Sequence, residues 1–295
     1  VPAVERAGVI AATNGHPLYI ELLARRGATA GREAIEEHLR SEIYSRLPEA
    51  EKRILGTAAV LGREAPPAAL LDPGGDPAVL DGLVEKNLLV RSASGVLSMH
   101  DTLREFFMSR LSPIDKQKDH RRAAAYLLGA GPGATLDALR HLILAGDRSG
   151  AAAVLDESGQ RLLDLGHGRL MLSEVLEKLS PADCEADRWG RLLLLTAEAH
   201  TASGDRDRAL QIHQKAAESG GGTAARAWYG TGEILRERSD WEGATDAYTR
   251  SVALSPSMKA EALRGLACVD WRQGSWTSSN EKFSEALKLA RREGR

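Results

Sequence analysis

Residues 228–256 read WYGTGEILRERSDWEGATDAYTRSVALSP. Apolar residues recur at helical spacing on both sides of a polar pair, Ser239-Asp240, which is typical of a tight turn. Pro256 closes the stretch at a point where a helix must stop. The pattern predicts a helix, a turn and a second helix packed antiparallel to the first.

The same pattern recurs on either side of this stretch with a period of 35 residues. Six positions keep this period, and most of them hold residues of one kind in all three copies. They are Leu193, Trp228 and Leu263; Ala197, Gly232 and Ala267; Gly204, Ser239 and Gly274; Ala209, Ala244 and Ser279; His213, Tyr248 and Phe283; and Ala216, Ser251 and Ala286. Large residues fill the space between helices, small ones allow close approach, and Gly or Ser permits the reversal.

This unit resembles the tetratricopeptide repeat, a helix-turn-helix of about 34 residues. The residues at that family's signature positions are Trp228, Tyr229, Gly232, Trp241, Ala244, Tyr248 and Pro256, whereas Thr231 stands where the family prefers Leu. The resemblance implies that residues 187–295 form a tetratricopeptide-like α-superhelix. Its concave face would bind a protein or a small-molecule signal. The residues that make the contact cannot be named from the sequence.

Residues 113–186 are predicted to form diverged helical hairpins continuous with this array. Apolar residues recur at helical spacing in the segments 121–128, 136–145, 151–163 and 170–179, and glycines separate these segments. Gly146 and Ala151 keep the spacing of the turn and small-residue positions of the later repeats. A basic cluster follows Pro113 and is interpreted as a solvated linker face rather than as a nucleic-acid contact; its residues are Lys116, Lys118, His120, Arg121 and Arg122.

Residues 47–112 predict a winged helix, in which three helices precede a short β-hairpin. The expected helices span 49–61, 66–71 and 76–86, and the strands flank residues 91–95. The third helix carries Asp76, Asp81 and Glu85 against Lys86 alone, and only Arg91 marks the wing. Carboxylates repel phosphates, so DNA is an unfavoured partner.

Two short motifs add a resemblance to a larger family. Gly15-His16-Pro17 ends the first helical segment, and Met99-His100-Asp101 closes the winged helix. In this order, and ahead of a repeat array, the motifs resemble the C-terminal half of the STAND-type signalling NTPases. The resemblance implies that residues 1–46 are the end of a helical NTPase lid. It also implies that Pro17 contacts adenine and that His100 lies near the phosphates of ADP.

The sequence lacks the G-x-x-x-x-G-K-[ST] loop that holds phosphates in that family. We therefore expect this chain to be part of a longer parent protein and not to be an enzyme by itself. We expect no catalytic residue, no metal ligand and no cofactor in it. ATP or ADP would bind an upstream NTPase core in the parent.

The preferred prediction is a regulatory sensor half. The array binds a signal, and the winged helix relays its occupancy to the upstream nucleotide site. One alternative is a standalone tetratricopeptide-repeat adaptor for proteins. A second alternative is a winged-helix transcriptional regulator that binds DNA. On the alternative interpretation of the motifs, Pro17 forms a turn between helices and His100 packs in the core or caps a helix.

Composition sets outer bounds on these predictions. Hydrophobic residues make up 43% of the 295 residues and charged residues 27%, as in ordered globular proteins. The formal net charge of −2 lacks the basic excess of non-specific nucleic-acid binders. The two cysteines, Cys184 and Cys268, form no CxxC pair and are expected to be small core residues. Neither a membrane-spanning run nor a signal peptide is found, so a cytoplasmic location is expected.

Overall fold

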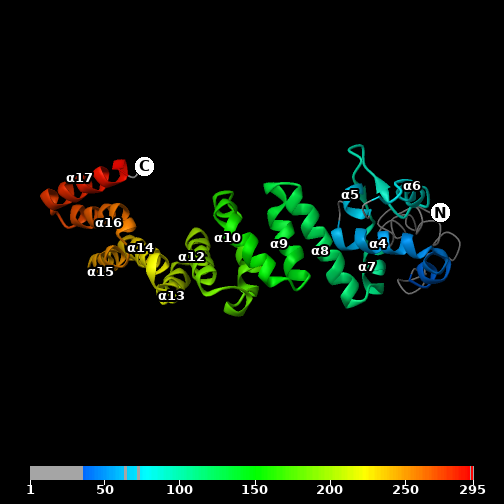
Figure 1. The fold of residues 1–295 in the computed structure, drawn as a ribbon, viewed down its shortest axis with the longest axis horizontal. Coiled ribbons are helices and arrows are strands. Elements are labelled where there is room, and N and C mark those ends of the chain that lie inside the picture. Colours follow the sequence, from blue (N-terminus) through cyan, green and yellow to red (C-terminus); the bar gives the residue numbers. More distant parts are fainter. Residues whose placement is uncertain (1–35, 63–64, 72–73, 293, 295) are drawn as a thin grey trace, which may run out of the picture. The chain divides into compact units, whose positions relative to one another are not determined.

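The computed structural model describes residues 36–62, 65–71, 74–292 and 294. These residues are mainly helical and include one two-stranded antiparallel sheet, which confirms the predicted fold class. Contacts divide the chain into two compact units (Figure 1). In its described part, the first unit comprises residues up to 134 together with 144–146, and the second comprises 135–143 and the residues from 147 onward.

The first unit contains a helical bundle with a small hairpin. Its elements are η1 (Leu39–Ile43), η2 (Tyr44–Arg46), α4 (Glu49–Leu61), α5 (Pro67–Leu70), α6 (Ala78–Glu85), β1 (Val90–Arg91), β2 (Leu97–Ser98), α7 (Asp101–Arg110), α8 (Pro113–Gly129) and η3 (Pro132–Ala134). Three helices therefore precede a hairpin, in the predicted order. Val90 pairs with Ser98 and Arg91 with Leu97. Ala65 also pairs with Leu97, its N–H donating to the Leu97 carbonyl at 2.7 Å.

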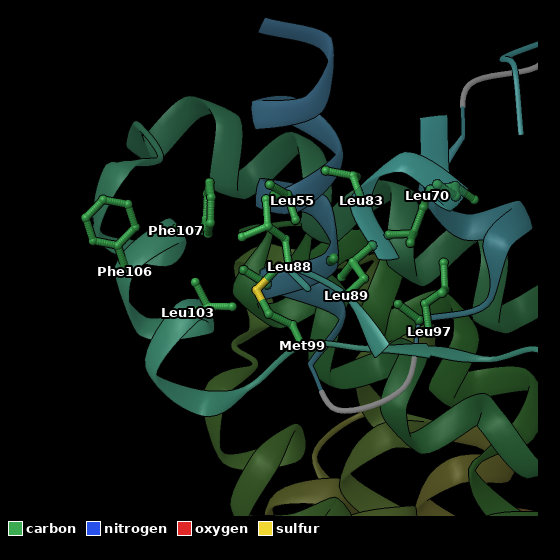
Figure 2. Close-up of a cluster of buried hydrophobic side chains, with 14 of the residues drawn as sticks. Leu55, Leu70, Leu83, Leu88, Leu89, Leu97, Met99, Leu103, Phe106 and Phe107 are labelled. Carbon is green, nitrogen blue, oxygen red and sulfur yellow. The ribbon is translucent and has the colours of Figure 1, made fainter. Parts of the chain in front are cut away.

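A leucine-rich core holds these elements together (Figure 2). Leu55 of α4, Leu83 of α6 and Leu103 of α7 are fully buried in it. Phe106 and Phe107 of α7 contact each other edge to face, with ring centroids 5.5 Å apart. Apolar burial of this kind stabilises by about 25 cal/mol per Å² of area removed from water, so the core fixes the hairpin between α6 and α7.

The segment after Pro113 is part of a helix, so the prediction that it is a linker is wrong. Lys118 and Arg121 are exposed, as predicted, whereas His120 is buried. Ser112 caps α8, because its hydroxyl oxygen accepts the Asp115 N–H at 3.1 Å, and Pro113 opens the first turn. Asp119 is buried in this helix, and the Thr57 hydroxyl of α4 donates to its carboxylate at 3.0 Å. The basic residues stand on a helix that has one buried face.

The second unit is a series of helices joined by short turns. Its elements are α9 (Thr135–Leu144), α10 (Arg148–Asp164), α11 (Gly168–Glu174), η4 (Leu176–Lys178), η5 (Pro181–Asp183), α12 (Ala186–Ala202), α13 (Arg206–Ala217), α14 (Gly221–Glu237), α15 (Trp241–Leu254), η6 (Pro256–Met258), α16 (Lys259–Arg272) and α17 (Trp276–Arg292). From α12 to α17 each helix packs on the next. The first helices of successive pairs, α12, α14 and α16, also contact one another, which gives the stacked arrangement of a tetratricopeptide-like array.

The turns between paired helices repeat one geometry. Gly204, Ser239 and Gly274 all have left-handed backbone, with φ of +84°, +61° and +80°. The Asp205 and Asp240 carboxylates accept the N–H of the third residue of the following helix, at 3.1 and 3.0 Å. Glycine favours the left-handed region, and aspartate favours the cap. The local chemistry of the turn therefore fixes the period.

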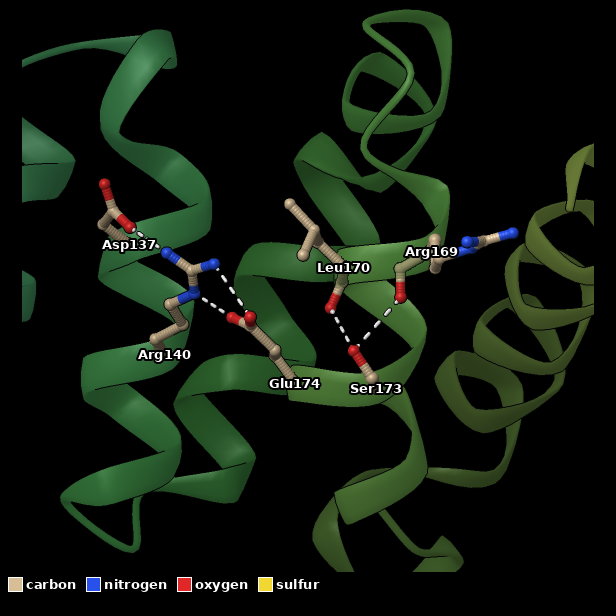
Figure 3. A network of polar contacts seen from close by, with 6 residues as sticks. All are labelled: Asp137, Arg140, Arg169, Leu170, Ser173 and Glu174. Carbon is tan, nitrogen blue, oxygen red and sulfur yellow. Dashed lines mark hydrogen bonds and ion pairs between the residues drawn. The ribbon is translucent and has the colours of Figure 1, made fainter.

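The predicted helix 170–179 is wrong, because it divides into two short elements. α11 ends at Glu174, and Val175 leaves helical geometry with φ −129° and ψ −65°. Ser173 donates to the carbonyls of Arg169 and Leu170, and such back-bonding bends helices (Figure 3). Arg140 of α9 donates hydrogen bonds to the Glu174 carboxylate from Nε and, at 2.8 Å, from Nη2 (Figure 3). The end of α11 is thus tied to α9.

Candidate functional site

The motif around His100 lies at the junction of the hairpin and α7. His100 is half-buried and caps α7, since its Nδ1 accepts the Thr102 N–H at 3.3 Å. Met99 is buried in the core beside Leu103 (Figure 2). Asp101 begins the helix, and its carboxylate lies 3.5 Å from Arg104. The structure thus shows the hydrogen bond expected if His100 caps a helix, whereas the contact of His100 with a nucleotide stays a prediction. Pro17 lies outside the described residues.

The two basic residues next to α6 are engaged by acidic neighbours. Arg91 Nη2 lies 2.6 Å from Asp81 Oδ1, and Lys86 Nζ lies 2.7 Å from Glu51 Oε1. A DNA phosphate would have to displace a carboxylate at either position. This geometry favours the prediction that DNA is not the partner of this module.

A cavity of about 730 Å³ opens on the second unit, within the usual range of ligand sites. We call it the array cavity. It is lined chiefly by α10, α12 and α14, with Ser257 and Met258 from η6 and single residues from α13 and α16. Its apolar wall consists of Leu163, Leu194, Ile234 and Met258. The site therefore combines residues that are far apart in the sequence and lie on one side of the array.

Acidic side chains dominate the polar wall of the array cavity. There are five of them, against one guanidinium from Arg226: Asp164, Glu198, Glu233, Glu237 and Glu261. Glu233 accepts bonds from Arg236 at 2.9 Å and from the Tyr248 hydroxyl at 2.6 Å. Burial tends to raise the pKa of Glu233, but these two donors hold it below its usual value. Glu237 pairs with Arg206 at 2.7 Å.

Glu198 differs from these paired carboxylates. Burial raises the pKa of its carboxyl, and repulsion from Asp164 adds to the rise, while Arg226 and Gln160 oppose it. A carboxyl in this condition is incompletely compensated by its surroundings. A positive charge placed beside Glu198 would therefore be stabilised.

His213 reaches the array cavity from the outer helix α13. It faces Gly230 of α14, where an added Cβ would lie only 2.4 Å from the imidazole Cε1. The ring is buried, and Nδ1 has no hydrogen-bond partner among the described residues. Burial lowers the pKa of His213 to about 4, so the ring is neutral at pH 7. The sequence indicated packing at this position, and the ring also borders the cavity.

The aromatic wall of the array cavity comes from Tyr229. Arg264 donates to its hydroxyl at 2.5 Å, and burial raises the pKa of the phenol. The ring of Tyr229 also lies 5.8 Å from that of Tyr248. The phenol is thereby fixed in place and protonated at neutral pH.

The sequence placed partner binding on residues 187–295, and the cavity extends further. Gln160, Leu163 and Asp164 of α10 line it, although they belong to the segment interpreted as diverged hairpins. The signal was the Gly146-to-Ala151 spacing, which marks α10 as equivalent to a repeat helix. Gly146 is left-handed with φ +74°, and Ala151 is fully buried.

Other candidate chemistry is sparse in the part of the chain that the structure describes. It contains no group of three or more His, Cys, Asp or Glu side chains arranged to hold a metal ion. Cys184 and Cys268 are free thiols and half-buried, so the expectation that they are core residues is wrong. Among the described helices, none combines the length and the apolar character needed to cross a bilayer.

Comparisons with known proteins give only distant similarities. No family model and no curated protein matches the sequence. Among solved structures, a Signal Transduction ATPase with Numerous Domains (STAND) protein with a tetratricopeptide repeat sensor, from Pyrococcus horikoshii, is 17% identical. The match covers 100% of this chain and 52% of that one, with a TM-score of 0.46. This chain thus spans about half the length of that protein. BtubC (BKLC) from P. vanneervenii is 12% identical over 84% of this chain and 93% of that one, with a TM-score of 0.36. Similarity at this level does not assign a function.

Proposed function

We propose that this chain is a sensor whose repeat array binds a signal in the array cavity. The observation that carries the proposal is the cavity itself. Helices α10, α12, α14 and α16 all contribute to one apolar and acidic recess large enough for a small molecule or part of a peptide. A ligand that bridges several repeats changes the stacking free energy between them. The chain would contribute binding, and no catalytic step is assigned to it.

The finer proposal is that the signal controls a STAND-type nucleotide site located upstream of this chain. It rests on the order of the motifs around Pro17 and His100, ahead of a repeat array. One feature of the first unit supports it. His100 lies between the hairpin and α7 and caps that helix by accepting the Thr102 N–H. A histidine that both fixes a helix start and contacts ADP would couple the nucleotide to that helix. ATP or ADP is assigned to the parent protein and not to this chain.

The test uses the full-length parent protein loaded with labelled ADP. His100→Ala removes both the cap and the imidazole, whereas His100→Asn restores a good helix cap without an imidazole. We expect both variants to release ADP faster than the parent. If only His100→Ala releases ADP faster, His100 acts as a helix cap and does not contact the nucleotide. Unchanged release in both variants would overturn the proposal that His100 couples the nucleotide site to α7.

A second candidate, a protein adaptor, is favoured by the apolar surface of the last helix pair. Trp271 and Trp276 are both more than half exposed and contact each other edge to face, with centroids 4.5 Å apart. Phe283 and Leu287 border a groove of about 410 Å³ on α16 and α17. If a partner protein covers this groove, and if the rate of ADP release is the same in the parent and in the His100 variants, the adaptor function is favoured over the sensor function.

A further inference from the structure

The second helix of each pair in the array carries a ring at one fixed position. His213 of α13 and Tyr248 of α15 hold this position, and both rings are buried. Each ring lies against a glycine of the following helix, Gly230 of α14 or Gly265 of α16, with no room for an added Cβ. Phe283 of α17 holds the same position in the last pair but is 38% exposed. In the part of the chain that the structure describes, no helix covers it.

Phe283 belongs to an apolar stripe along α17. Trp276, Phe283 and Leu287 recur at i, i+7 and i+11, a spacing that puts them on one face of a helix. We call these three residues the α17 stripe. All three are exposed, and Ala286 and Ala290 border the groove of about 410 Å³ beside Phe283 and Leu287. Large apolar side chains and a groove walled by small ones thus lie on one surface.

The equivalent stripe on α15 is covered by α16. It consists of Trp241, Tyr248 and Val252, and it shares one apolar cluster with three residues of α16, namely Ala262, Leu266 and Val269. Tyr248 is fully buried in this interface, and Trp241 and Val252 are half-buried. The α17 stripe therefore continues an interface that the array already uses, and the occupant of that interface is a helix.

The covering helices share a short pattern, Ala-x-x-Gly-x-x-x-Ile/Val. It is formed by Ala227, Gly230 and Ile234 in α14, and by Ala262, Gly265 and Val269 in α16. This spacing places the three residues on one face, where the small ones allow close approach to the ring and the last adds an apolar contact. Among the described helices, α14 and α16 alone carry the pattern, and both use it inside their own array. A second copy of the chain therefore offers no free helix of this kind in its described part.

Charge indicates how the occupant is oriented. α15 ends at Leu254 and α16 begins at Lys259, so the N-terminus of a covering helix lies beside the last turn of the helix that it covers. At the last turns of α17, the side chains of Lys288, Arg291 and Arg292 are exposed. Acidic residues in the first turn of the occupant would be favoured by these cations and by the dipole of the occupant itself.

Resting on the adaptor function, the second candidate above, we propose that the α17 stripe binds an amphipathic α-helix of a partner protein. This helix carries Ala-x-x-Gly-x-x-x-Ile/Val on its apolar face and an acidic residue in its first turn, and its glycine lies over Phe283. It occupies on α17 the place that α16 occupies on α15. The α17 stripe does not line the array cavity, so binding of a signal there is a separate property.

The probe is a synthetic peptide with the sequence of α16, which holds both the pattern and Glu261 in its first turn. Helices of this length are marginal in water, so a hydrocarbon staple on the face opposite Gly265 keeps the peptide helical. Fluorescence anisotropy of the labelled peptide is measured as the whole chain is added, and we expect saturable binding. A Gly265→Leu peptide should bind about tenfold more weakly or worse, because its side chain meets Phe283. If neither peptide binds, or if both bind equally, the helical occupant is wrong.

Variants of the chain locate the bound peptide. Phe283→Ala removes the ring, and we expect it to weaken binding of the α16 peptide by about tenfold. The same variant should bind the Gly265→Leu peptide better than the parent chain does, because leucine fills the vacated space; such a reversal reports direct contact. Leu165→Ala is the matched control, since Leu165 is an exposed apolar residue outside the α17 stripe. Equal weakening by Leu165→Ala would overturn the site. Circular dichroism checks that each variant is folded.

Two further measurements separate the partner helix from other occupants. Sedimentation velocity at rising concentration should show a monomer; a dimer lost in Phe283→Ala would assign the stripe to a second copy and overturn the proposal. The peptide should also bind the full-length parent; failure there would mean that the parent covers the stripe with its own chain. If a partner protein covers the groove while the peptide does not bind, the adaptor function stands and the helical occupant alone is wrong.

Discussion

The ring of Tyr248 on α15 lies against the backbone of Gly265 on α16, where an added Cβ would come within 2.4 Å of the phenol Cζ. His213 and Gly230 stand in the same relationship one repeat earlier, and in both pairs the glycine follows the ring by seventeen residues. The ring of one repeat therefore occupies the space that a side chain would take on the next first helix. This contact sets how closely successive repeats stack.

Gly265→Ala should destabilise the array. The new methyl would force the fully buried Tyr248 ring to move, and overpacking of this kind costs about 1–3 kcal/mol. Gly222→Ala is the control, because that helical glycine has no atom within 4 Å of an added Cβ. It should be neutral or stabilising by up to about 1 kcal/mol. Urea unfolding monitored by circular dichroism measures both, and equal stability of the two variants would contradict the stacking role.

Ser239→Gly should stabilise the second unit. Ser239 is held in left-handed backbone at φ +61°, a conformation that costs a non-glycine residue about 1–2 kcal/mol. Part of that gain is offset by the greater freedom of glycine in the unfolded chain, so a net gain of about 0.5–1 kcal/mol is expected. The reverse change, Gly204→Ser at the equivalent turn, should lose a similar amount. Thermal melts of both variants test the pair, and a melting temperature lowered by Ser239→Gly would refute the argument.

The sequence predicted the repeats because their determinants are local. Left-handed turns need glycine or a small polar residue, and caps need aspartate, so Gly204 and Asp205 can be recognised without knowing their neighbours. The start of α8 was missed although the same kind of signal was present. Ser112 and Pro113 are a cap and a first-turn proline, but the basic residues that follow are typical of a solvated linker and obscure this signal.

The array cavity could not be predicted in this way. Asp164, Glu198 and Glu261 lie on three separate helices, and each by itself is indistinguishable from an ordinary solvated charge. Only the stacking of those helices brings them to one recess. The spacing of seventeen residues between His213 and Gly230 can be read from the sequence. That the ring packs against this glycine follows only from the packing of the two helices.

Stability of the second unit should fall in acid through Asp156 of α10. Bonds from Arg191, at 2.6 and 2.7 Å, hold the pKa of this carboxyl below its ordinary value; burial opposes them and Arg188 assists. Since the folded pKa is depressed, the contribution is present above the unfolded pKa of about 3.9 and is lost as pH falls through the folded pKa. Asp156→Asn should therefore destabilise by roughly 1–2 kcal/mol at pH 7 and by little near pH 2.

The control for Asp156 is Asp246→Asn on α15. Asp246 forms an exposed pair with Arg250 four residues along the same helix, at 2.9 Å, and such pairs contribute about 0.5 kcal/mol or less. Urea titrations at both pH values compare the two variants. If Asp156→Asn lowered stability equally at pH 7 and pH 2, a packing defect rather than the lost ion pairs would explain its effect.

The contribution of Asp119 of α8 to stability should depend on pH in the opposite direction. Burial raises the pKa of its carboxyl, against the bond from Thr57 and the charge of Arg122. Because the folded pKa lies above the unfolded one, its contribution is fully present below the unfolded pKa and is lost as pH rises through the folded pKa. Asp119→Asn keeps an oxygen that accepts the Thr57 hydroxyl and removes the buried charge. The variant should therefore be more stable than the parent chain at pH 7, and the difference should vanish at low pH.

Differential scanning calorimetry from pH 3 to 8 measures this difference in the Asp119→Asn variant. Glu85→Gln is the matched control, since Glu85 is exposed on α6 and its neutralisation removes no buried charge. An Asp119→Asn variant less stable than the parent at pH 7 would mean that the ionised carboxylate stabilises α8 against α4. The bond from Thr57 would then outweigh desolvation, which reverses the order of effects inferred from the burial of this side chain.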